Sequence, residues 1–271
     1  MTLEESIRYH AQNTPDKCAV VCAGDQISYS GLWNSLVGRA SELEKNGLRP
    51  NRPYVFRATQ DIDFIITYCA VHYMGAIAVP LENKVPQEVF QSIRSEVESC
   101  DFSDDIVDIL YTTGTTGKSK GVMLSETALV SCADNFIADL HFTPELLFII
   151  SGPLNHIASL FKMHPVLTVG GTVCVLDGLK DMNAFFEVFE LPYKKFATFL
   201  VPASIRMIMQ FSYEKLCSLA DKIDFIETGA APITQHDMEQ LSKALPKSRL
   251  YNTLGGTEIG AVCTYNFNDG K

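Results

Sequence analysis

Short apolar runs alternate along the chain with longer segments in which apolar residues recur every three or four positions. The short runs favour buried strands, and the longer periodicity favours helices. We expect strands over residues 18–22, 26–29, 54–58, 76–80, 106–112, 146–151, 172–176, 196–200, 225–228 and 249–253. We expect helices over residues 3–13, 31–46, 62–74, 88–98, 125–140, 159–169, 182–189, 202–211 and 234–245.

The regular alternation of strands with helices is the pattern of βαβ units, in which successive strands run parallel. The sequence therefore predicts an α/β fold built on mainly parallel sheets. Locally, Ser30 is the expected N-cap of the second helix, and Gly24 with Asp25 is the expected turn between the first two strands.

The most apolar window runs from Ile62 to Leu81, but it contains Asp63 and His72. It predicts a buried helix followed by a strand, not a membrane span. The N-terminal segment is polar and acidic, unlike a signal peptide. The eight cysteines form no CxxC pair and no tight Cys/His cluster. We therefore expect reduced, mostly buried thiols in a cytoplasmic protein.

Charge excludes one broad class of function. The chain carries 22 Lys and Arg against 32 Asp and Glu, a formal net charge of −10. A general nucleic-acid binder needs a basic surface to neutralise phosphates, so nucleic acid is not an expected partner. A small local phosphate site is still compatible with this balance.

The segment with the clearest chemistry is Tyr111 to Val122, which reads YTTGTTGKSKGV and follows an apolar run. Glycines let backbone N–H groups turn toward an anion, threonines add hydroxyl donors, and lysines add positive charge. These are the requirements of a polyphosphate site. A Walker A loop is disfavoured because Thr112 stands where its first glycine belongs. The other alternative is a flexible surface turn.

This segment resembles the signature loop of the adenylate-forming superfamily, which includes acyl-CoA synthetases, luciferases and adenylation domains of peptide synthetases. The family pattern is roughly [Y/F]-T-[S/T]-G-[S/T]-[T/S]-G-x-P-K-G-V, and only its proline differs, being Ser119 here. Further family segments follow in order. They are Pro153-Leu-Asn-His156, Gly229-Ala-Ala-Pro232 and Asn252-Thr-Leu-Gly255-Gly-Thr257-Glu258.

The resemblance implies ATP-dependent conversion of a small carboxylic acid to an acyl adenylate, with Mg²⁺ and, for the acceptor thiol, CoA. It implies that the phosphates are wrapped by Thr112, Thr113, Gly114, Thr115, Thr116 and Gly117, with Lys120 as the loop lysine. It places Gly229, Ala230, Ala231, Asn252, Leu254 and Gly255 around the nucleotide. It assigns Mg²⁺ to Glu258, the α-phosphate to Thr257 and the substrate carboxylate to His156.

Each of these assignments has a structural alternative. Glu258 taken alone reads as a solvated charge at a strand end, and a lone histidine such as His156 is more often a hydrogen-bonded structural residue. Gly229 to Ala231 also suits a strand-to-helix turn, with Pro232 at the start of the helix.

Two departures from the family pattern bear on the substrate. The aromatic residue that stacks on adenine is replaced by Leu254. Amino-acid adenylation domains carry an acidic residue shortly after the position of His156, whereas Ile157 follows here. This favours an acid with an uncharged acyl or aryl tail, and hence an acyl- or aryl-CoA synthetase.

The family's later T-G-D segment, hinge and C-terminal lysine have no counterpart in these residues. We therefore expect a truncated N-terminal AMP-binding domain over 1–271, in which a small C-terminal domain is the missing partner. We expect two doubly wound, mainly parallel sheets flanked by helices. One subdomain spans about 51–140, and the other spans 1–50 with 141–265. Two alternatives are an inactive nucleotide-binding module and a remnant that acts through protein contacts.

Overall fold

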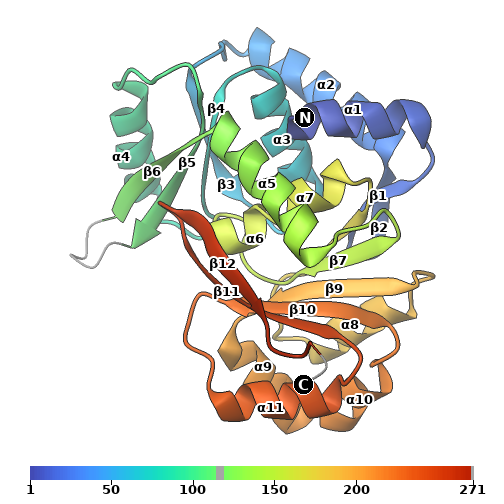
Figure 1. Ribbon diagram of the computed structural model, residues 1–271. Helices are drawn as coiled ribbons and strands as arrows, with labels where there is room; N and C mark the ends of the chain where they lie inside the picture. Colours follow the sequence, from blue (N-terminus) through green and yellow to red (C-terminus); the bar gives the residue numbers. More distant parts are fainter. Residues whose placement is uncertain (114–118, 270–271) are drawn as a thin grey trace.

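The strands form two separate sheets in the computed structural model, which describes residues 1–113 and 119–269 (Figure 1). The larger sheet consists of β1 (Cys18–Cys22), β2 (Asp25–Ser28), β7 (Leu146–Ile150), β8 (Thr172–Val175), β9 (Lys195–Leu200), β10 (Ile223–Gly229), β11 (Arg249–Gly256) and β12 (Gly260–Asn266). The smaller sheet consists of β3 (Pro53–Ala58), β4 (Ile77–Glu82), β5 (Ile106–Thr113) and β6 (Ser119–Ser125).

Most neighbouring strands run parallel, as the alternation of elements predicts. The order in the larger sheet is β12-β11-β10-β9-β7-β8-β1-β2, and in the smaller sheet it is β3-β4-β5-β6. Antiparallel pairs occur at sheet edges, where β2 pairs with β1, β12 with β11 and β6 with β5. The expected α/β fold with two mainly parallel sheets is confirmed.

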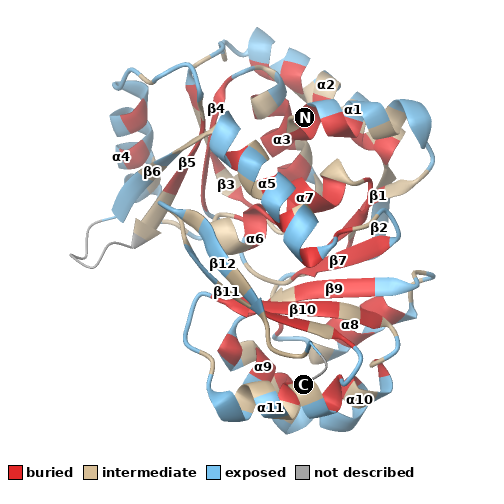
Figure 2. Ribbon diagram, viewed as in Figure 1, coloured by how far each residue is buried: buried red, intermediate tan, exposed pale blue. Residues whose placement is uncertain are grey.

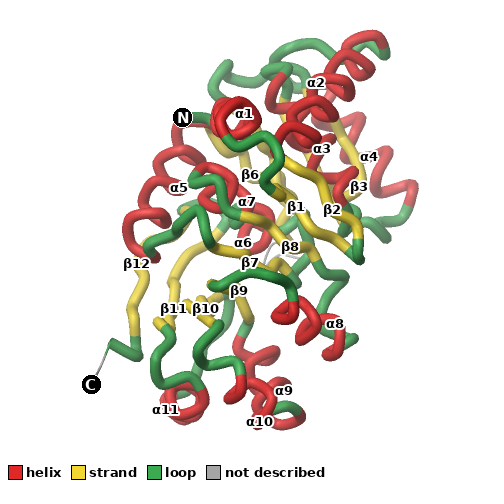
Figure 3. Tube along the Cα trace, turned by 90° about the vertical axis from the view of Figure 1, so that its right-hand side faces the viewer, coloured by secondary structure: helices red, strands yellow, loops and turns green. Residues whose placement is uncertain are grey.

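Helices cover these sheets in layers, as the views in Figures 1 and 3 show. The central layer between the sheets contains α1 (Leu3–Asn13), α2 (Tyr29–Lys45), α3 (Ile62–Tyr73), α5 (Glu126–Leu140), α6 (Ile157–Leu160) and α7 (Met163–Thr168). The outer face of the larger sheet carries α8 (Met182–Glu187), the 3-10 turn η1 (Val188–Glu190), α9 (Pro202–Phe211), α10 (Tyr213–Ser218) and α11 (Gln235–Ala244). The outer face of the smaller sheet carries α4 (Gln87–Glu98).

The alternation of side chains in β7 shows why this layering follows from the sequence. All five residues of β7 are buried, with Leu146, Phe148 and Ile150 in the central core and Leu147 and Ile149 in the outer one. A strand covered on both faces must be apolar throughout, because successive side chains point to opposite faces. Figure 2 shows the resulting buried band across the middle of the larger sheet.

Several local expectations are corrected by the structure. The N-cap of α2 is Ser28 and not Ser30, since the Ser28 hydroxyl accepts a hydrogen bond from Gly31 N–H. The turn before β2 is formed by Ala23 and Gly24, both with positive φ, which suits a tight hairpin. Burial of the thiols is also lower than expected, because three of the eight cysteines are buried.

The elements that the sequence did not predict have physical explanations. No strand is expected over β6, because its apolar run is only Val122 to Leu124 and is shorter than that of a central strand; its residues are exposed or half-buried. The helix expected over 159–169 is divided into α6 and α7, and Pro165 lies in this segment, where it lacks the N–H that a continuous helix would use. The short helix α10 was also not expected.

The apolar window from Ile62 to Leu81 folds as expected, into buried α3 and β4. Nowhere in residues 1–113 and 119–269 is a helix long and apolar enough to cross a bilayer.

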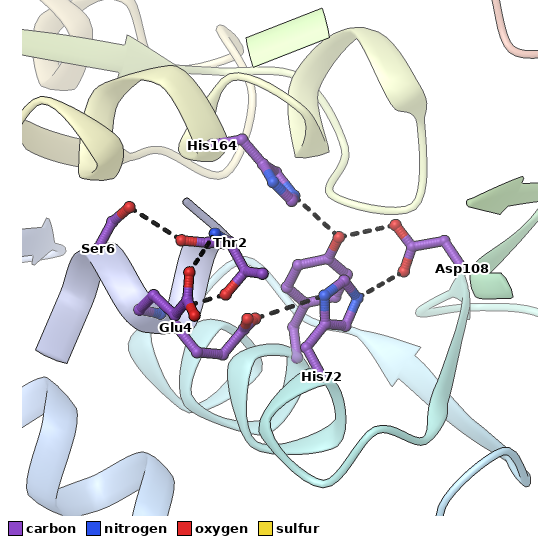
Figure 4. Close-up of polar contacts among 8 residues, drawn as sticks. Thr2, Glu4, Ser6, His72, Asp108 and His164 are labelled. Carbon is purple, nitrogen blue, oxygen red and sulfur yellow. Dashed lines mark hydrogen bonds and ion pairs between the residues drawn. The ribbon is translucent and has the colours of Figure 1, made fainter. Parts of the chain in front are cut away.

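A buried polar network connects α1, α3, β5 and α7 in the central layer (Figure 4). His72 Nε2 lies 2.8 Å from Asp108 Oδ1, and His72 Nδ1 lies 3.5 Å from Glu4 Oε1. Tyr68 donates its hydroxyl hydrogen to Asp108 Oδ2 at 2.7 Å, so His164 Nε2, 3.0 Å away, donates to the Tyr68 oxygen. The network therefore joins the smaller sheet to the helices packed on it.

Burial and charge shift the two histidines of this network in opposite directions. Burial alone would lower the pKa of His72, but attraction and a hydrogen bond to Asp108 raise that pKa to about 10. Burial and repulsion by His72 lower the pKa of His164 to about 4. The pKa of Glu4 is lowered because its contact with His72 outweighs its burial. The folded network thus holds a cationic His72 and a neutral His164.

These shifts predict maximum stability near pH 6.5. The raised pKa of His72 contributes stability below its unfolded value of 6.5, and this is lost as pH rises toward about 10. The lowered pKa of His164 has the opposite effect. As pH falls from 6.5 toward about 4, stability decreases, because His164 takes up a proton in the unfolded chain but stays neutral in the folded one. Urea unfolding at pH 5, 6.5 and 8.5 should give the highest midpoint at 6.5.

The matched variants separate the two sides of this profile. His72→Gln should flatten the decline between pH 6.5 and 8.5, whereas His164→Gln should flatten the decline toward pH 5. A wild-type midpoint that does not change between pH 6.5 and 8.5 would contradict the assigned charge of His72.

Candidate active site

A cavity lies where the central helices meet the end of β10 and the β11–β12 hairpin. Its volume is about 600 Å³. One side is formed by α5 and α6, and the other by Phe199 of β9, Glu227 of β10, and Thr253 with residues 255–261 of the hairpin. Figure 1 shows this hairpin running alongside α5. The cavity therefore opens at the carboxyl ends of parallel strands, where ligands of α/β folds bind.

Five residues that the motifs single out line this cavity together. They are His156, Ala230, Gly255, Thr257 and Glu258. Because they come from three segments far apart in the sequence, only the folded chain brings them to one place. This convergence favours the functional interpretation of the segments over separate structural roles.

Close packing between strands explains the small residues at the end of β10. Gly229 pairs with Thr253 of β11, and a Cβ on Gly229 would lie 2.6 Å from the Thr253 carbonyl oxygen. The next residue, Ala230, has φ +64°, a left-handed conformation that is unusual for alanine. Such strain is concentrated at binding sites. The chain thus turns sharply at the cavity wall before α11 begins.

His156 and Glu258 both lie exposed at the cavity. His156 is the N-cap residue of α6, and its side chain makes no capping hydrogen bond. Glu258 lies in the turn between β11 and β12, beside Gly256. Both side chains are therefore placed where a ligand in the cavity can reach them.

The other expected site residues differ in how far the structure places them. Thr112 and Thr113 end β5, and Thr112 pairs with Lys120 across the β5–β6 hairpin. Gly229, Ala231, Asn252 and Leu254 lie next to cavity residues in sequence but not in the wall, and Leu254 is 63% exposed. Gly114, Thr115, Thr116 and Gly117 lie outside the described residues.

Sequence reasoning missed an ion pair in the cavity wall. Lys162 Nζ donates to Glu227 Oε1 at 2.8 Å and lies 2.6 Å from Oε2. The side chains are only 4% and 1% exposed. The ammonium group also lies 3.8 Å from the Phe136 ring centre and 5.4 Å from that of Phe199. The wall therefore combines a neutralised charge pair with aromatic rings.

A weak signal for this pair is present in the sequence. Lys162 interrupts the apolar stretch Leu160 to Val166, and Glu227 lies in an apolar strand directly before the Gly229 turn. Isolated charges in buried segments are rarely left unpaired. Two such charges of opposite sign are candidates for an ion pair. Their sequence separation of 65 residues does not show that these two residues pair with each other.

The side chains at the cavity could hold Mg²⁺ only together with a polyanion. Within the described ranges 1–113 and 119–269, no group of three or more His, Cys, Asp and Glu side chains is arranged to hold a metal. Glu258 supplies one carboxylate at the cavity. Mg²⁺ commonly binds through one or two carboxylates together with phosphate oxygens, which agrees with this arrangement.

Comparison with known proteins identifies relatives along nearly the whole chain. A family model described as AMP-binding enzyme matches residues 7–102 and 84–271. A D-alanine–D-alanyl carrier protein ligase of Bacillus licheniformis is 23% identical over 97% of this chain and 60% of its own length. 4-coumarate-CoA ligase 1 of Narcissus pseudonarcissus is 30% identical over 66% of this chain and 34% of its own length. The chain thus spans about 60% or less of these relatives.

Solved structures with the same fold include apo MatB of Rhodopseudomonas palustris, with a TM-score of 0.84 and 20% identity. That match covers 100% of this chain and 63% of MatB. The N-terminal subdomain of Klebsiella oxytoca NpsA in complex with 3-hydroxyanthranilyl-AMSN has a TM-score of 0.81 at 18% identity. This match covers 98% of the present chain and 76% of the NpsA chain. The present chain therefore has the same fold as the matched parts of both structures.

The buried ion pair leads to a stability prediction. Lys162→Met should destabilise the protein by about 3–5 kcal/mol, because it leaves the Glu227 carboxylate buried without a counter-charge. The double variant Lys162→Met/Glu227→Leu should recover most of that loss, since an apolar pair of similar size removes both desolvation costs. Urea unfolding of the wild type and both variants measures the difference. A double variant no more stable than the single one would contradict the prediction.

Proposed function

Because the chain belongs to the AMP-binding enzyme family, we propose that it binds ATP with Mg²⁺ and takes part in adenylating a carboxylic acid. In this reaction an oxygen of the acid forms a bond to the α-phosphorus, and pyrophosphate leaves. The observation that carries the proposal is the convergence of His156, Ala230 and residues 255–258 on one cavity.

The residues at the cavity suggest a division of roles. His156, at the start of α6, would position the substrate carboxylate, and Thr257 would donate to the α-phosphate. Gly229, Ala230 and Ala231 would border the nucleotide, and Ala230 is the one of these that lines the cavity. Alignment of the carboxylate with the phosphorus, together with charge neutralisation, would supply the rate enhancement.

Glu258 is the residue we assign to Mg²⁺. The cation, when bound, would neutralise phosphate charge and orient the phosphates. Thr112 and Lys120 flank residues 114–118 on paired strands, so the β5–β6 hairpin would hold the glycine- and threonine-rich segment for the phosphates.

We further propose a thiol acceptor, CoA being the candidate that the sequence favours. Ile157 follows His156, so the acidic residue typical of amino-acid adenylation domains is absent from that position. The similarity to 4-coumarate-CoA ligase 1 supports this choice, whereas the similarity to a D-alanine–D-alanyl carrier protein ligase supports a carrier protein as acceptor.

Titration calorimetry with ATP tests the assignment of Glu258. Glu258→Gln keeps the shape but removes the charge, so it should weaken ATP binding in Mg²⁺ and have much less effect in EDTA. Glu187→Gln, at an exposed position on α8, is the matched control and should bind as the wild type does. Equal losses in Mg²⁺ and EDTA would indicate a structural role, and no ATP binding by the wild type would favour a remnant that acts through protein contacts.

A second measurement concerns the segment Thr112 to Gly121. Replacing Thr115 and Thr116 together by valine should weaken ATP or pyrophosphate binding while the unfolding midpoint stays unchanged. Each charge-assisted hydrogen bond lost is worth about 1.5–3 kcal/mol. ATP affinity equal to that of the wild type would refute the phosphate-binding role of this segment.

A further inference from the structure

The β5–β6 hairpin has little backbone pairing with the rest of the smaller sheet. Within residues 1–113 and 119–269, the ladder between β4 and β5 contains one residue pair, Ala78 with Asp108. In contrast, all six residues of β3 pair with β4. β6 lies at the edge of the sheet and pairs with β5. The direction of the hairpin therefore depends on what holds Asp108.

Two side chains of α3 hold the Asp108 carboxylate, one at each oxygen (Figure 4). The Tyr68 hydroxyl donates to Oδ2 at 2.7 Å, and His72 Nε2 lies 2.8 Å from Oδ1. His72 is cationic, because its contacts with Asp108 raise its pKa to about 10. Asp108 itself is only 1% exposed. A buried carboxylate that is bonded at both oxygens has one favoured position, so α3 fixes β5 at this residue.

The same contacts continue to the wall of the cavity. The Tyr68 oxygen accepts a hydrogen bond from His164 Nε2 of α7 at 3.0 Å. The His164 ring stacks on the Phe161 ring, with centroids 5.3 Å apart and planes inclined by 12°. Phe161 lines the cavity together with His156, the N-cap residue of α6. A continuous series of contacts thus connects β5 with the side of the cavity that carries His156.

The far end of the hairpin is sensitive to the position of Asp108. Thr112 lies four residues further along β5, about 13 Å away at the usual rise of a strand, and pairs with Lys120 of β6. In the proposed function this end of the hairpin holds the outer phosphates, and His156 holds the carboxylate. A tilt of the hairpin at Asp108 would displace Thr112 and Lys120 relative to the cavity. Misplacement of about 1 Å is enough to weaken aligned contacts strongly.

We propose that Asp108, Tyr68 and His164 are positioning residues that align the phosphate-binding end of the β5–β6 hairpin with the cavity. They touch neither the nucleotide nor the acid. Asp108 acts through β5, His164 acts through Phe161, and the Tyr68 hydroxyl joins the two. The inference rests on the proposed function, because it assumes that the outer phosphates of ATP bind at this hairpin.

Titration calorimetry of the 271-residue chain with ATP and with AMP, both in Mg²⁺, tests the proposal. AMP lacks the two outer phosphates, so its binding does not depend on the far end of the hairpin, and the wild type should bind ATP more tightly. Tyr68→Phe removes the hydroxyl shared by Asp108 and His164 but keeps the ring. It should weaken ATP binding roughly tenfold, the effect of one charge-assisted hydrogen bond, and leave AMP binding unchanged. The ratio of ATP to AMP affinity therefore falls.

A second buried tyrosine provides the matched control. Tyr29 is fully buried like Tyr68, and its hydroxyl donates to the Gly171 carbonyl oxygen at 2.7 Å, directly before β8 of the larger sheet. Tyr29→Phe also loses one buried hydrogen bond, so its urea midpoint should fall, but its ATP/AMP ratio should equal that of the wild type. If Tyr68→Phe does not fold, Asp108→Asn provides the same ratio. It keeps the shape but removes one acceptor oxygen and the charge, so the ratio should again fall.

The outcomes separate this inference from the proposed function. If the wild type prefers ATP but Tyr68→Phe and Asp108→Asn keep its ATP/AMP ratio, the inference is wrong and the proposed function stands. If Tyr29→Phe lowers the ratio as much as Tyr68→Phe, the ratio follows general stability, and the inference is again wrong. If the wild type binds neither nucleotide, the proposed function fails, and the inference fails with it.

Discussion

The close approach of β10 to β11 is the constraint on which the candidate site depends. A side chain at Gly229 would collide with the Thr253 carbonyl oxygen, so the strands can pair in this register only with glycine there. Because side chains alternate along a strand, Glu227 shares a face with Gly229 and points toward the central helical layer. The same register brings Thr253 to the cavity wall. One backbone contact thus places the turn, the buried carboxylate and the adjoining hydroxyl.

Two buried polar clusters in the central layer illustrate different uses of charge. In the network around Asp108, each of the main polar groups has a described partner on another element, and the network connects α1, α3, β5 and α7. At the cavity, the Lys162 ammonium lies within 2.8 Å of both carboxylate oxygens of Glu227, and the Thr253 hydroxyl has no partner among the described residues. A buried polar network between elements favours one arrangement of those elements, whereas an unpaired hydroxyl beside a cavity is available to a ligand.

Most of the fold could be predicted because local patterns and tertiary packing agree. Apolar runs such as Leu146 to Ile150 identify strands buried on both faces, and the intervening periodic segments identify helices. The prediction failed at β6, whose exposed and half-buried residues form an antiparallel edge, and near Pro165, where α6 and α7 replace one helix. In both places the outcome depends on pairing or packing with distant segments, which local periodicity does not record.

The residues of the site that belong to sequence motifs could be predicted, and the others could not. His156, Gly255 and Glu258 came from recognisable segments and do line one cavity, whereas Lys162 and Glu227 belong to no motif and meet only in the folded chain. This difference has a physical basis. Groups that handle a shared chemical step are restricted by that chemistry, but residues that contact a variable part of a substrate are not. An apolar pair would fill the positions of Lys162 and Glu227 at comparable stability, so the stability of the fold does not account for the ion pair.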